Sequence, residues 1–237
     1  MAIIKEKPVT FDAVEHKYYL TGTNRRLISA TQLISKFKEP FDPSGEITRK
    51  YALKNGLTVQ EVLAMWKQVN EDSCTYGTEV HLLMEDYVNT GIIKDSPYKH
   101  FVEQFKTFRE ANITGKLHSE VMVYSEDLMV AGMVDLIEKV GDTVNILDFK
   151  TNKKLEKKSQ WGSKMINGLW YLEDVNFIHY EIQLSLYAYL CELKGLKIGD
   201  LIILYFNPKT QLLETHTARY MRNEILHILE KKKDFIY

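Results

Sequence analysis

Apolar and polar residues follow two different periods along this chain, and the change falls near Lys116. Between residues 44 and 111, apolar residues recur with the 3.6-residue spacing that buries one stripe of a helix, so this part predicts amphipathic helices. The predicted helical segments are 44–54, 59–70, 75–90 and 98–111. Gly91 ends the third of them, because glycine is the usual residue just past a helix.

Beyond Lys116, short apolar runs are separated by turn residues, which predicts β-strands. Three strands are expected within 117–151, with turns at Ser125–Leu128 and Gly141–Asp142. The remaining expected elements are a hairpin followed by a short helix over 8–36, a helix at 179–194, a hairpin at Asn207-Pro208, and a helix at 219–233. This order predicts an α/β (α+β) fold, in which a central mixed sheet is flanked by helices and preceded by an N-terminal hairpin and helical extension.

The turn at Gly141–Asp142 determines which residues of its two strands face each other. If those two residues form the loop, Asp135 stands opposite Asp148. Opposed side chains in an antiparallel pair are only about 5 Å apart, and like charges there are destabilising. A shared proton or a bound cation would relieve the repulsion, so the register predicts one of these two at the aspartates.

The preceding turn brings a third acid to the same place. With Glu126–Asp127 as its loop, Glu120 faces Met133 and is diagonal to Asp135. Lys150 shares a face with Asp148, because side chains two residues apart on a strand point the same way. An isolated Asp-x-Lys is commonly a surface ion pair, but here the flanking residues are apolar and three acids converge.

Carboxylates beside a lysine suit a hard divalent cation, Mg²⁺ or Mn²⁺, and phosphodiester hydrolysis. In this interpretation Lys150 orients the attacking hydroxide or stabilises the charge that develops on the phosphate. The chain contains no G-x-S-x-G, Walker A or G-x-G-x-x-G motif, which disfavours acyl transfer, nucleotide hydrolysis and hydride transfer.

Two helical pairs extend the candidate site. Gly77 and His81 are four residues apart, so they share a helix face, and His81 could supply an imidazole ligand. Gln183 and Tyr187 have the same spacing on a later helix and could touch a phosphate or a base edge. Each pair alone is also what an ordinary structural helix contains.

Composition narrows the class of protein. The 237 residues are 45% hydrophobic, which is sufficient for the core of a single domain spanning 1–237. The net charge of −1 excludes a protein that coats nucleic acid over its whole surface. Two cysteines cannot form a four-cysteine zinc or iron–sulfur site, and they fit a reducing compartment. Without a signal-like segment or an apolar run of membrane length, a soluble intracellular protein is expected, in a bacterium or a phage-infected cell.

Together these motifs resemble the PD-(D/E)XK nuclease superfamily, in particular its RecB-type exonuclease branch. The matching residues occur in the family's order over about residues 75–190: Gly77 and His81, Glu120, Gly132 and Asp135, Asp148 and Lys150, Gln183 and Tyr187. The resemblance implies a restriction-endonuclease-like core at 73–237 behind an extension at 1–72. It implies no iron–sulfur cluster, because the members that carry one have four cysteines.

The resemblance also implies roles for these residues. His81, Asp135, Asp148 and the carbonyl of Phe149 would bind the metal, Glu120 would support it, and Lys150 would be catalytic. Gln183 and Tyr187 would help to hold the site and the DNA strand.

Lysines crowd the segment directly after the catalytic strand. Lys153 and Lys154, together with Trp161, could contact phosphates and an unpaired base. We therefore expect a Mg²⁺- or Mn²⁺-dependent exonuclease acting on single-stranded or frayed DNA ends, with a recombination or replication protein as a possible partner and no membrane. A flap or junction endonuclease and a non-catalytic DNA-binding module are the alternatives.

Overall fold

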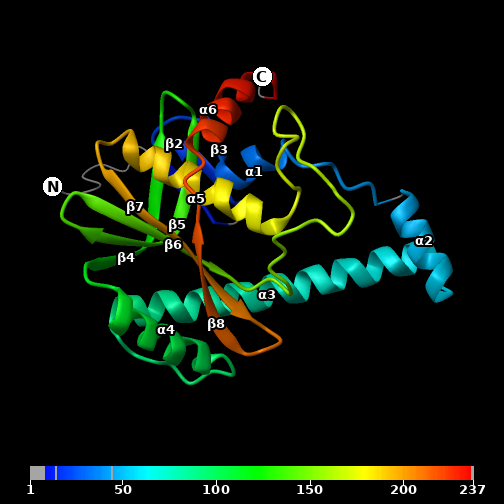
Figure 1. Cartoon of the computed structure of the whole chain (residues 1–237), viewed down its shortest axis with the longest axis horizontal. Helices are drawn as coiled ribbons and strands as arrows, with labels where there is room; N and C mark the ends of the chain where they lie inside the picture. The colour runs from blue at the N-terminus through cyan, green and yellow to red at the C-terminus, as the bar shows by residue number, and fades with distance from the viewer. Residues whose placement is uncertain (1–8, 14, 44, 236–237) are drawn as a thin grey trace.

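The part of the chain that the structure describes forms one mixed sheet of eight strands with helices on both faces (Figure 1). A mixed sheet flanked by helices is the fold class that the sequence predicts. The computed structural model describes residues 9–13, 15–43 and 45–235. Residues 1–8, which contain the start of the predicted hairpin and the segment expected to lack a secretion signal, lie outside the described residues. No helix in the described ranges is both long enough and apolar enough to cross a membrane.

Helices and strands follow the predicted order. They are β1 (Val9–Asp12), β2 (Lys17–Leu20), β3 (Arg26–Ser29), α1 (Ala30–Ser35), α2 (Glu46–Asn55), α3 (Val59–Thr90), α4 (Lys99–Asn112), β4 (Lys116–Ser125), β5 (Val130–Val140), β6 (Thr143–Lys150), α5 (Asn176–Glu192), β7 (Lys197–Asn207), β8 (Leu212–Ala218) and α6 (Arg222–Lys231). The strands lie in the order β1-β2-β3-β5-β6-β7-β8, with β4 paired to β5. Two of the pairings, β3 with β5 and β6 with β7, are parallel.

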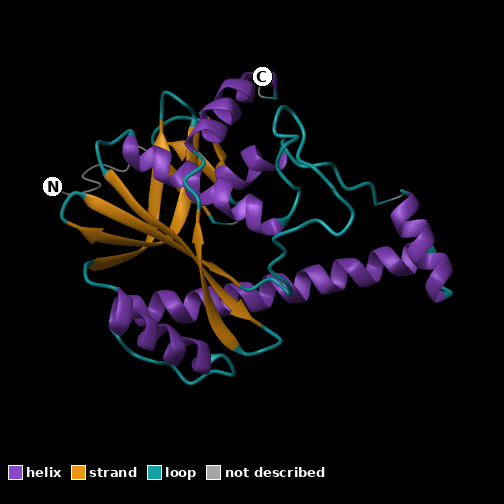
Figure 2. Ribbon diagram, in the orientation of Figure 1, coloured by secondary structure: helices purple, strands orange, loops and turns teal. Residues whose placement is uncertain are grey.

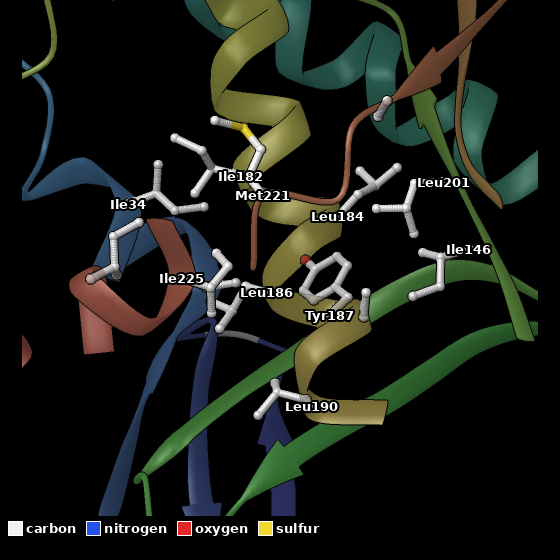
Figure 3. Packing of buried hydrophobic residues seen from close by; sticks show 14 of the residues in the cluster. Ile34, Ile146, Ile182, Leu184, Leu186, Tyr187, Leu190, Leu201, Met221 and Ile225 are labelled. Atoms are coloured by element: carbon white, nitrogen blue, oxygen red, sulfur yellow. The ribbon is translucent and has the colours of Figure 1, made fainter. Parts of the chain in front are cut away.

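Helices cover both faces of this sheet (Figure 2), and each face buries an apolar layer. On one face, α3 and α4 bury an aromatic cluster that includes Phe105, Phe149 and Phe206. On the other face, α5 packs on the sheet, and α1 and α6 pack beside it (Figure 3). Leu186 and Leu190 of α5 are almost completely buried there. Phe149 therefore points to one layer, while its neighbours Asp148 and Lys150 point to the other.

The N-terminal part differs from the predicted single hairpin. It contains three strands, because the chain turns again after β2 and β3 pairs with it. β3 then runs parallel to the start of β5, through Ile28↔Val130 and Ser29↔Ala131. Ser29 caps α1 through a full capping box with Gln32. This additional strand joins the N-terminal segment to the main sheet.

The predicted helices at 59–70 and 75–90 are one continuous helix, α3. The expectation of two helices is wrong because the residues between them contain neither proline nor glycine and nothing interrupts the backbone hydrogen bonds. Both expected ends are present, since Thr58 and Glu61 form the capping box and Gly91 ends the helix with φ of 73°. The stretch 67–75 is exposed on all sides as α3 extends from the body of the protein towards α2 (Figure 1).

The two hairpins of the core differ in how well the sequence predicts their registers. Between β5 and β6 the pairs run from Val140↔Thr143 to Leu136↔Leu147, which confirms the predicted register. Between β4 and β5, Ser125 pairs with Val130 and not with Leu128. The loop is longer than predicted because the chain needs four residues, 126–129, to turn, with φ of 49° at the last one.

That correction moves the partner of Glu120 by two residues along β5. In the observed register Glu120 falls between the pairs Ser119↔Leu136 and Val121↔Val134, so it stands opposite Asp135 and not opposite Met133. Its own φ of 48° interrupts regular pairing there. Because the register error is two residues, the side chain remains on the predicted face of the sheet.

Candidate active site

The candidate site lies where the sheet divides. β4 lies along the whole of one edge of β5, so β3 and β6 share the other edge. β3 pairs with the start of β5, whereas pairing with β6 begins only at Leu136↔Leu147. Asp135 and Asp148 are the next pair in this register, just beyond the last bonded one. The gap left by the diverging strands allows groups from both layers to meet at these two aspartates.

Asp135 compensates for a missing backbone contact. Its Oδ2 accepts a hydrogen bond of 2.7 Å from the backbone N–H of Phe149, in place of the ladder bond that has ended. The same oxygen is 3.5 Å from Nδ1 of His81 on α3. Burial, followed by repulsion from Asp148, raises the pKa of Asp135 to about 6. The predicted ligands His81, Asp135 and Phe149 are thus adjacent in the fold.

Asp148 and Lys150 form an almost completely buried ion pair. The Lys150 ammonium lies against Oδ2 of Asp148, whose side chain is 2% exposed. No hydrogen bond of ordinary geometry reaches that oxygen, so the contact is an ion pair only. Burial lowers the pKa of Lys150, but Asp148 and Asp135 outweigh it and the net shift is upward. Lys150 is therefore a cation held among carboxylates.

Glu120 joins the acidic group from β4. Its pKa rises to about 7, first because of partial burial and then because of repulsion from Asp135, Glu85 and Asp148. Glu85 is one turn along α3 from His81, so both side chains come from the same helix face. Its proximity to Glu120 adds a fourth acid to the three that the strand registers bring together.

Gly77 allows α3 to approach the end of β6. A β-carbon on Gly77 would be 3.0 Å from Oγ1 of Thr151, directly after Lys150. The ring of His81, one turn on, packs edge-on against Phe149 with 5.7 Å between ring centres. The Gly-x-x-x-His spacing therefore serves a close approach of helix and strand.

Gly132 has the corresponding role for α5 on the other face. A β-carbon there would be 2.3 Å from Cε1 of Tyr187, so only glycine leaves space for that ring. Tyr187 is 3% exposed, and its hydroxyl accepts a hydrogen bond of 2.8 Å from Nε2 of Gln183. The two residues thus contact each other, with the tyrosine buried over β5.

Gly132→Ala is expected to destabilise the protein by about 1–3 kcal/mol, because the added methyl group overpacks a filled space. Thermal unfolding would measure the loss. Gly132→Ala combined with Tyr187→Leu should lose less stability than the sum of the two single variants, since the clash requires both groups. Additive losses would show that the contact between Gly132 and Tyr187 is unimportant.

Tyr180 is a site residue that sequence reasoning missed. The Lys150 ammonium lies 4.6 Å from the centre of its ring, and its hydroxyl donates a 3.1 Å hydrogen bond to Oδ1 of Asn152. Tyr180 precedes Gln183 by three residues, so it lies on the same face of α5. That spacing is the sequence feature from which Tyr180 could have been predicted as a site residue. The structure places an aromatic face beside the predicted catalytic lysine.

An open groove of about 230 Å³ lies beside Lys150. Its walls are Ser73, Cys74 and His81 from α3 on one side, and residues 149–152 with Tyr180 on the other. The exposed middle of α3 thus forms one wall of the groove. Access to the candidate site is from the space between α3 and the segment that follows β6.

The residues predicted to contact a DNA strand are distributed along the segment that follows β6. Lys153 and Lys154 are exposed and line a second, adjacent hollow. Trp161 is 90% exposed. The structure therefore leaves all three side chains free to contact a ligand, but it brings only the two lysines next to the β6 end of the site.

The donor set fits a hard divalent cation. Within the described residues no three histidine, cysteine or acidic side chains are already grouped as metal ligands. Asp135 is hydrogen-bonded to Phe149, and the Lys150 ammonium occupies the cation position beside Asp148. However, a buried carboxylate oxygen without a hydrogen bond, and two acids whose pKa values are raised first by burial and then by neighbouring carboxylates, are what a cation would stabilise.

These raised pKa values predict how stability depends on pH without metal. Asp135 and Glu120 hold protons more tightly when folded, so their contribution is fully present below pH 4 and is lost as pH rises through 6 to 7. A pKa of about 6 in the folded protein, against an ordinary value of 3.8, corresponds to roughly 3 kcal/mol at Asp135. The melting temperature in EDTA should therefore fall by several degrees between pH 4.5 and pH 7.5.

Added Mn²⁺ should raise the melting temperature more at pH 7.5 than at pH 5, because it binds the deprotonated carboxylates. Asp135→Asn should flatten the pH dependence measured in EDTA. A melting temperature that rises with pH in EDTA would contradict the assignment.

Comparison with known proteins gives the family of this chain. Residues 96–234, more than half of the chain, match the model of the PD-(D/E)XK nuclease superfamily. No curated protein matches the chain significantly. Among solved structures, SSO0001 is 15% identical, with a TM-score of 0.41 over 91% of this chain and 78% of that one. A candidate exonuclease from Eubacterium rectale is 14% identical, with a TM-score of 0.38 over 84% and 68%.

Proposed function

Because this chain belongs to the PD-(D/E)XK nuclease superfamily, we propose that it is a Mg²⁺- or Mn²⁺-dependent DNA exonuclease of the RecB-type branch. Its substrates in this proposal are single-stranded or frayed ends formed in recombination, repair or replication. A recombination or replication protein would recruit it to them. The observation that carries the proposal is the group of Asp135, the buried Asp148 and Lys150 at the fork of the sheet, beside an open groove.

The side chains divide the chemical work between them. His81, Asp135, Asp148 and the Phe149 carbonyl would hold the metal, which, when bound, supplies Lewis acidity and an activated water. Lys150 would release Asp148 to the metal and turn its ammonium towards the attacking oxygen or the phosphate. The ring of Tyr180, which is hydrogen-bonded to Asn152, lies beside the lysine and limits where its ammonium can go. Glu120, whose pKa is about 7, is suited to exchange a proton with water near neutral pH.

The size of the groove supports a single-stranded substrate. At about 230 Å³ it is smaller than the roughly 300–1,000 Å³ cavities that enclose drug-sized ligands. In this proposal one strand with its base unpaired enters the groove, whereas a duplex must fray first. The exposed Trp161 offers a surface on which an unpaired base can stack.

The test uses end-labelled linear strands, linear duplexes, flaps and closed single-stranded circles, each with Mg²⁺ or Mn²⁺. An exonuclease shortens the linear strands progressively and leaves circles intact. Degradation of circles at the rate of linear strands would contradict the exonuclease proposal, and a single cut at the flap junction would favour the endonuclease alternative. Strand binding in Ca²⁺ without cleavage in either activating metal would favour a binding module.

Trp161→Ala should weaken single-strand binding about 5- to 100-fold, since base stacking on an aromatic ring contributes about 1–3 kcal/mol. Fluorescence anisotropy in Ca²⁺ would measure it. The melting temperature should not change, because the ring is 90% exposed. Leu53→Ala, which removes an 87% exposed apolar side chain from α2, is the control and should bind normally. Equal affinity of the Trp161 variant and the wild type would contradict the stacking role.

A further inference from the structure

A second hollow, of about 450 Å³, lies next to the candidate site, above the end of the sheet formed by β7 and β8. Four lysines line it: Lys153, Lys154, Lys157 and Lys209. In the part of the chain that the structure describes, none of these ammonium groups is paired with a carboxylate. Four unpaired cations around one hollow favour an anionic ligand.

The two acids that line the hollow do not cancel this charge. They are Glu156 and Glu214. The Glu214 carboxylate accepts a 2.7 Å hydrogen bond from Nδ2 of Asn207, which occupies one of its oxygens. Four lysines against two glutamates leave the hollow positively charged, although the chain as a whole has a net charge of −1.

The lysine segment is held in place by the start of α5. Nδ2 of Asn176 donates to the carbonyl of Lys154 at 2.6 Å, and the Glu156 N–H donates to Oδ1 of the same asparagine at 2.8 Å. The Lys157 ammonium lies 4.8 Å from the centre of the Phe177 ring. These contacts hold the backbone at Lys154 and Glu156 and the side chain of Lys157 beside the hollow, so binding an anion there costs less conformational entropy than binding to a free loop.

His216 adds a neutral donor to the floor. Its Nδ1 is 3.2 Å from the Lys157 ammonium, which can only donate, so the ring proton belongs on Nε2. Nε2 is buried without a hydrogen-bond partner, 3.5 Å from the Glu214 carboxylate. Burial and Lys157 lower the pKa of His216, which keeps the ring neutral at physiological pH. An oxygen ligand in the hollow would satisfy this N–H.

Strand pairing relates the hollow to the candidate site. Asp148 pairs with Ile203, which pairs with His216, so the three lie in one row across the sheet. Lys150, Tyr205 and Glu214 form the next row. With neighbouring strands about 4.8 Å apart, the floor of the hollow is about 10 Å from Asp148. At about 3.4 Å of rise per stacked nucleotide, this is about three nucleotides or fewer along a strand.

We propose that this hollow binds a phosphate of the substrate strand, within about three nucleotides of the bond that is cut. The inference rests on the proposed nuclease function and specifies its substrate contact. The phosphate is either a terminal one, which would make the hollow a reader of strand ends, or an internal one, which would make it part of the track of the strand.

Binding of fluorescent single strands, with Ca²⁺ replacing Mg²⁺, tests the hollow without requiring cleavage. Lys157→Ala combined with Lys209→Ala should weaken binding by roughly tenfold or more. The slope of log affinity against log salt should fall by about 1.4, at about 0.7 per lost contact. The matched control is Lys139→Ala combined with Lys194→Ala, which removes the same charge from a separate hollow under the end of α5. Its affinity and salt slope should match the wild type.

Chemically altered strands identify which phosphate is bound. Strands carry a 5′-phosphate or 5′-hydroxyl, a 3′-phosphate or 3′-hydroxyl, or a neutral methylphosphonate at single internal positions. One of these changes should weaken wild-type binding about tenfold and have no further effect on the Lys157/Lys209 variant, because both remove the same contact. If that change is at an end of the strand, the hollow binds a terminal phosphate. If it is at an internal position, the hollow binds an internal one.

The inference would be overturned if every neutralised phosphate weakened both proteins equally, or if the control pair lost as much affinity as the test pair. Lys157→Gln combined with Lys209→Gln keeps most of each side-chain stem and serves if the alanine variant unfolds. A protein that cuts DNA normally but binds independently of these lysines would refute the hollow alone. Phosphate-dependent binding without cleavage would refute the exonuclease proposal alone.

Discussion

Asp148→Asn should reduce metal-dependent cleavage of single-stranded DNA on the order of 10³-fold or more. Asp148 is 1% exposed and stands beside Asp135 at the fork of the sheet. An amide has almost the shape of the carboxylate but no charge, so the variant should lose Mn²⁺ affinity as well as turnover. Calorimetric titration with Mn²⁺ and a gel assay with an end-labelled strand would measure the two losses.

Asp200→Asn is the matched control, because Asp200 is an exposed aspartate on the neighbouring strand β7. It should cleave and bind metal as the wild type does. Circular dichroism must show that Asp148→Asn is folded, since the change leaves the Lys150 ammonium buried without its partner. A folded Asp148→Asn variant with normal cleavage would remove Asp148 from the active site.

Lys150→Met should reduce cleavage about as much as Asp148→Asn does. It should strengthen metal binding, whereas Asp148→Asn should weaken it. The ammonium lies against Asp148, where it competes with a metal for the carboxylate. Removing it should tighten Mn²⁺ binding by roughly tenfold, since a positive charge is lost at close range. Reduced turnover with tighter metal binding distinguishes a catalytic lysine from one that only stabilises the fold.

Stability gives an independent test of the same ion pair. Without metal, Lys150→Met leaves a buried carboxylate unpaired, which costs about 3–5 kcal/mol. Combining it with Asp148→Asn should restore most of that loss without restoring cleavage. Lys197→Met, at the exposed start of β7, is the control and should change neither property. Weaker Mn²⁺ binding by Lys150→Met would contradict this account.

The sequence predicted the central register because the turn that sets it is short. Two residues, with Gly141 at φ of 61°, join β5 to β6, and a tight loop allows little choice of register. The preceding loop has four residues, and the loop predicted from the sequence has two. The predicted partner of Ser125 is therefore two positions from the observed one. An even error preserves the face of a strand. For this reason Glu120 was expected in the site although its predicted partner was wrong.

Other parts of the site depended on contacts that no local pattern reveals. Tyr180 has the spacing of an ordinary helix residue, and only the packing of α5 on β6 shows that its ring lies over Lys150. The row from Asp148 to His216 likewise requires the pairing of β6 with β7 and of β7 with β8. The first of these pairings joins strands separated by the whole of α5, and the sequence contains no turn that would set its register.

By itself, the sequence determined most of the order of helices and strands, the facing of Asp135 and Asp148, and a five-part order of residues that resembles the pattern of the superfamily. These properties depend on residue type, on periods of 2 and 3.6 residues, and on short turns, all of which are local. Only the tertiary structure determined that β5 diverges from β6 at the aspartates, so that His81 from one layer and Lys150 beside Tyr180 on the other meet at one site. The physical reason is that distances between remote segments are set by how whole faces pack, and packing depends on all the side chains of both layers together.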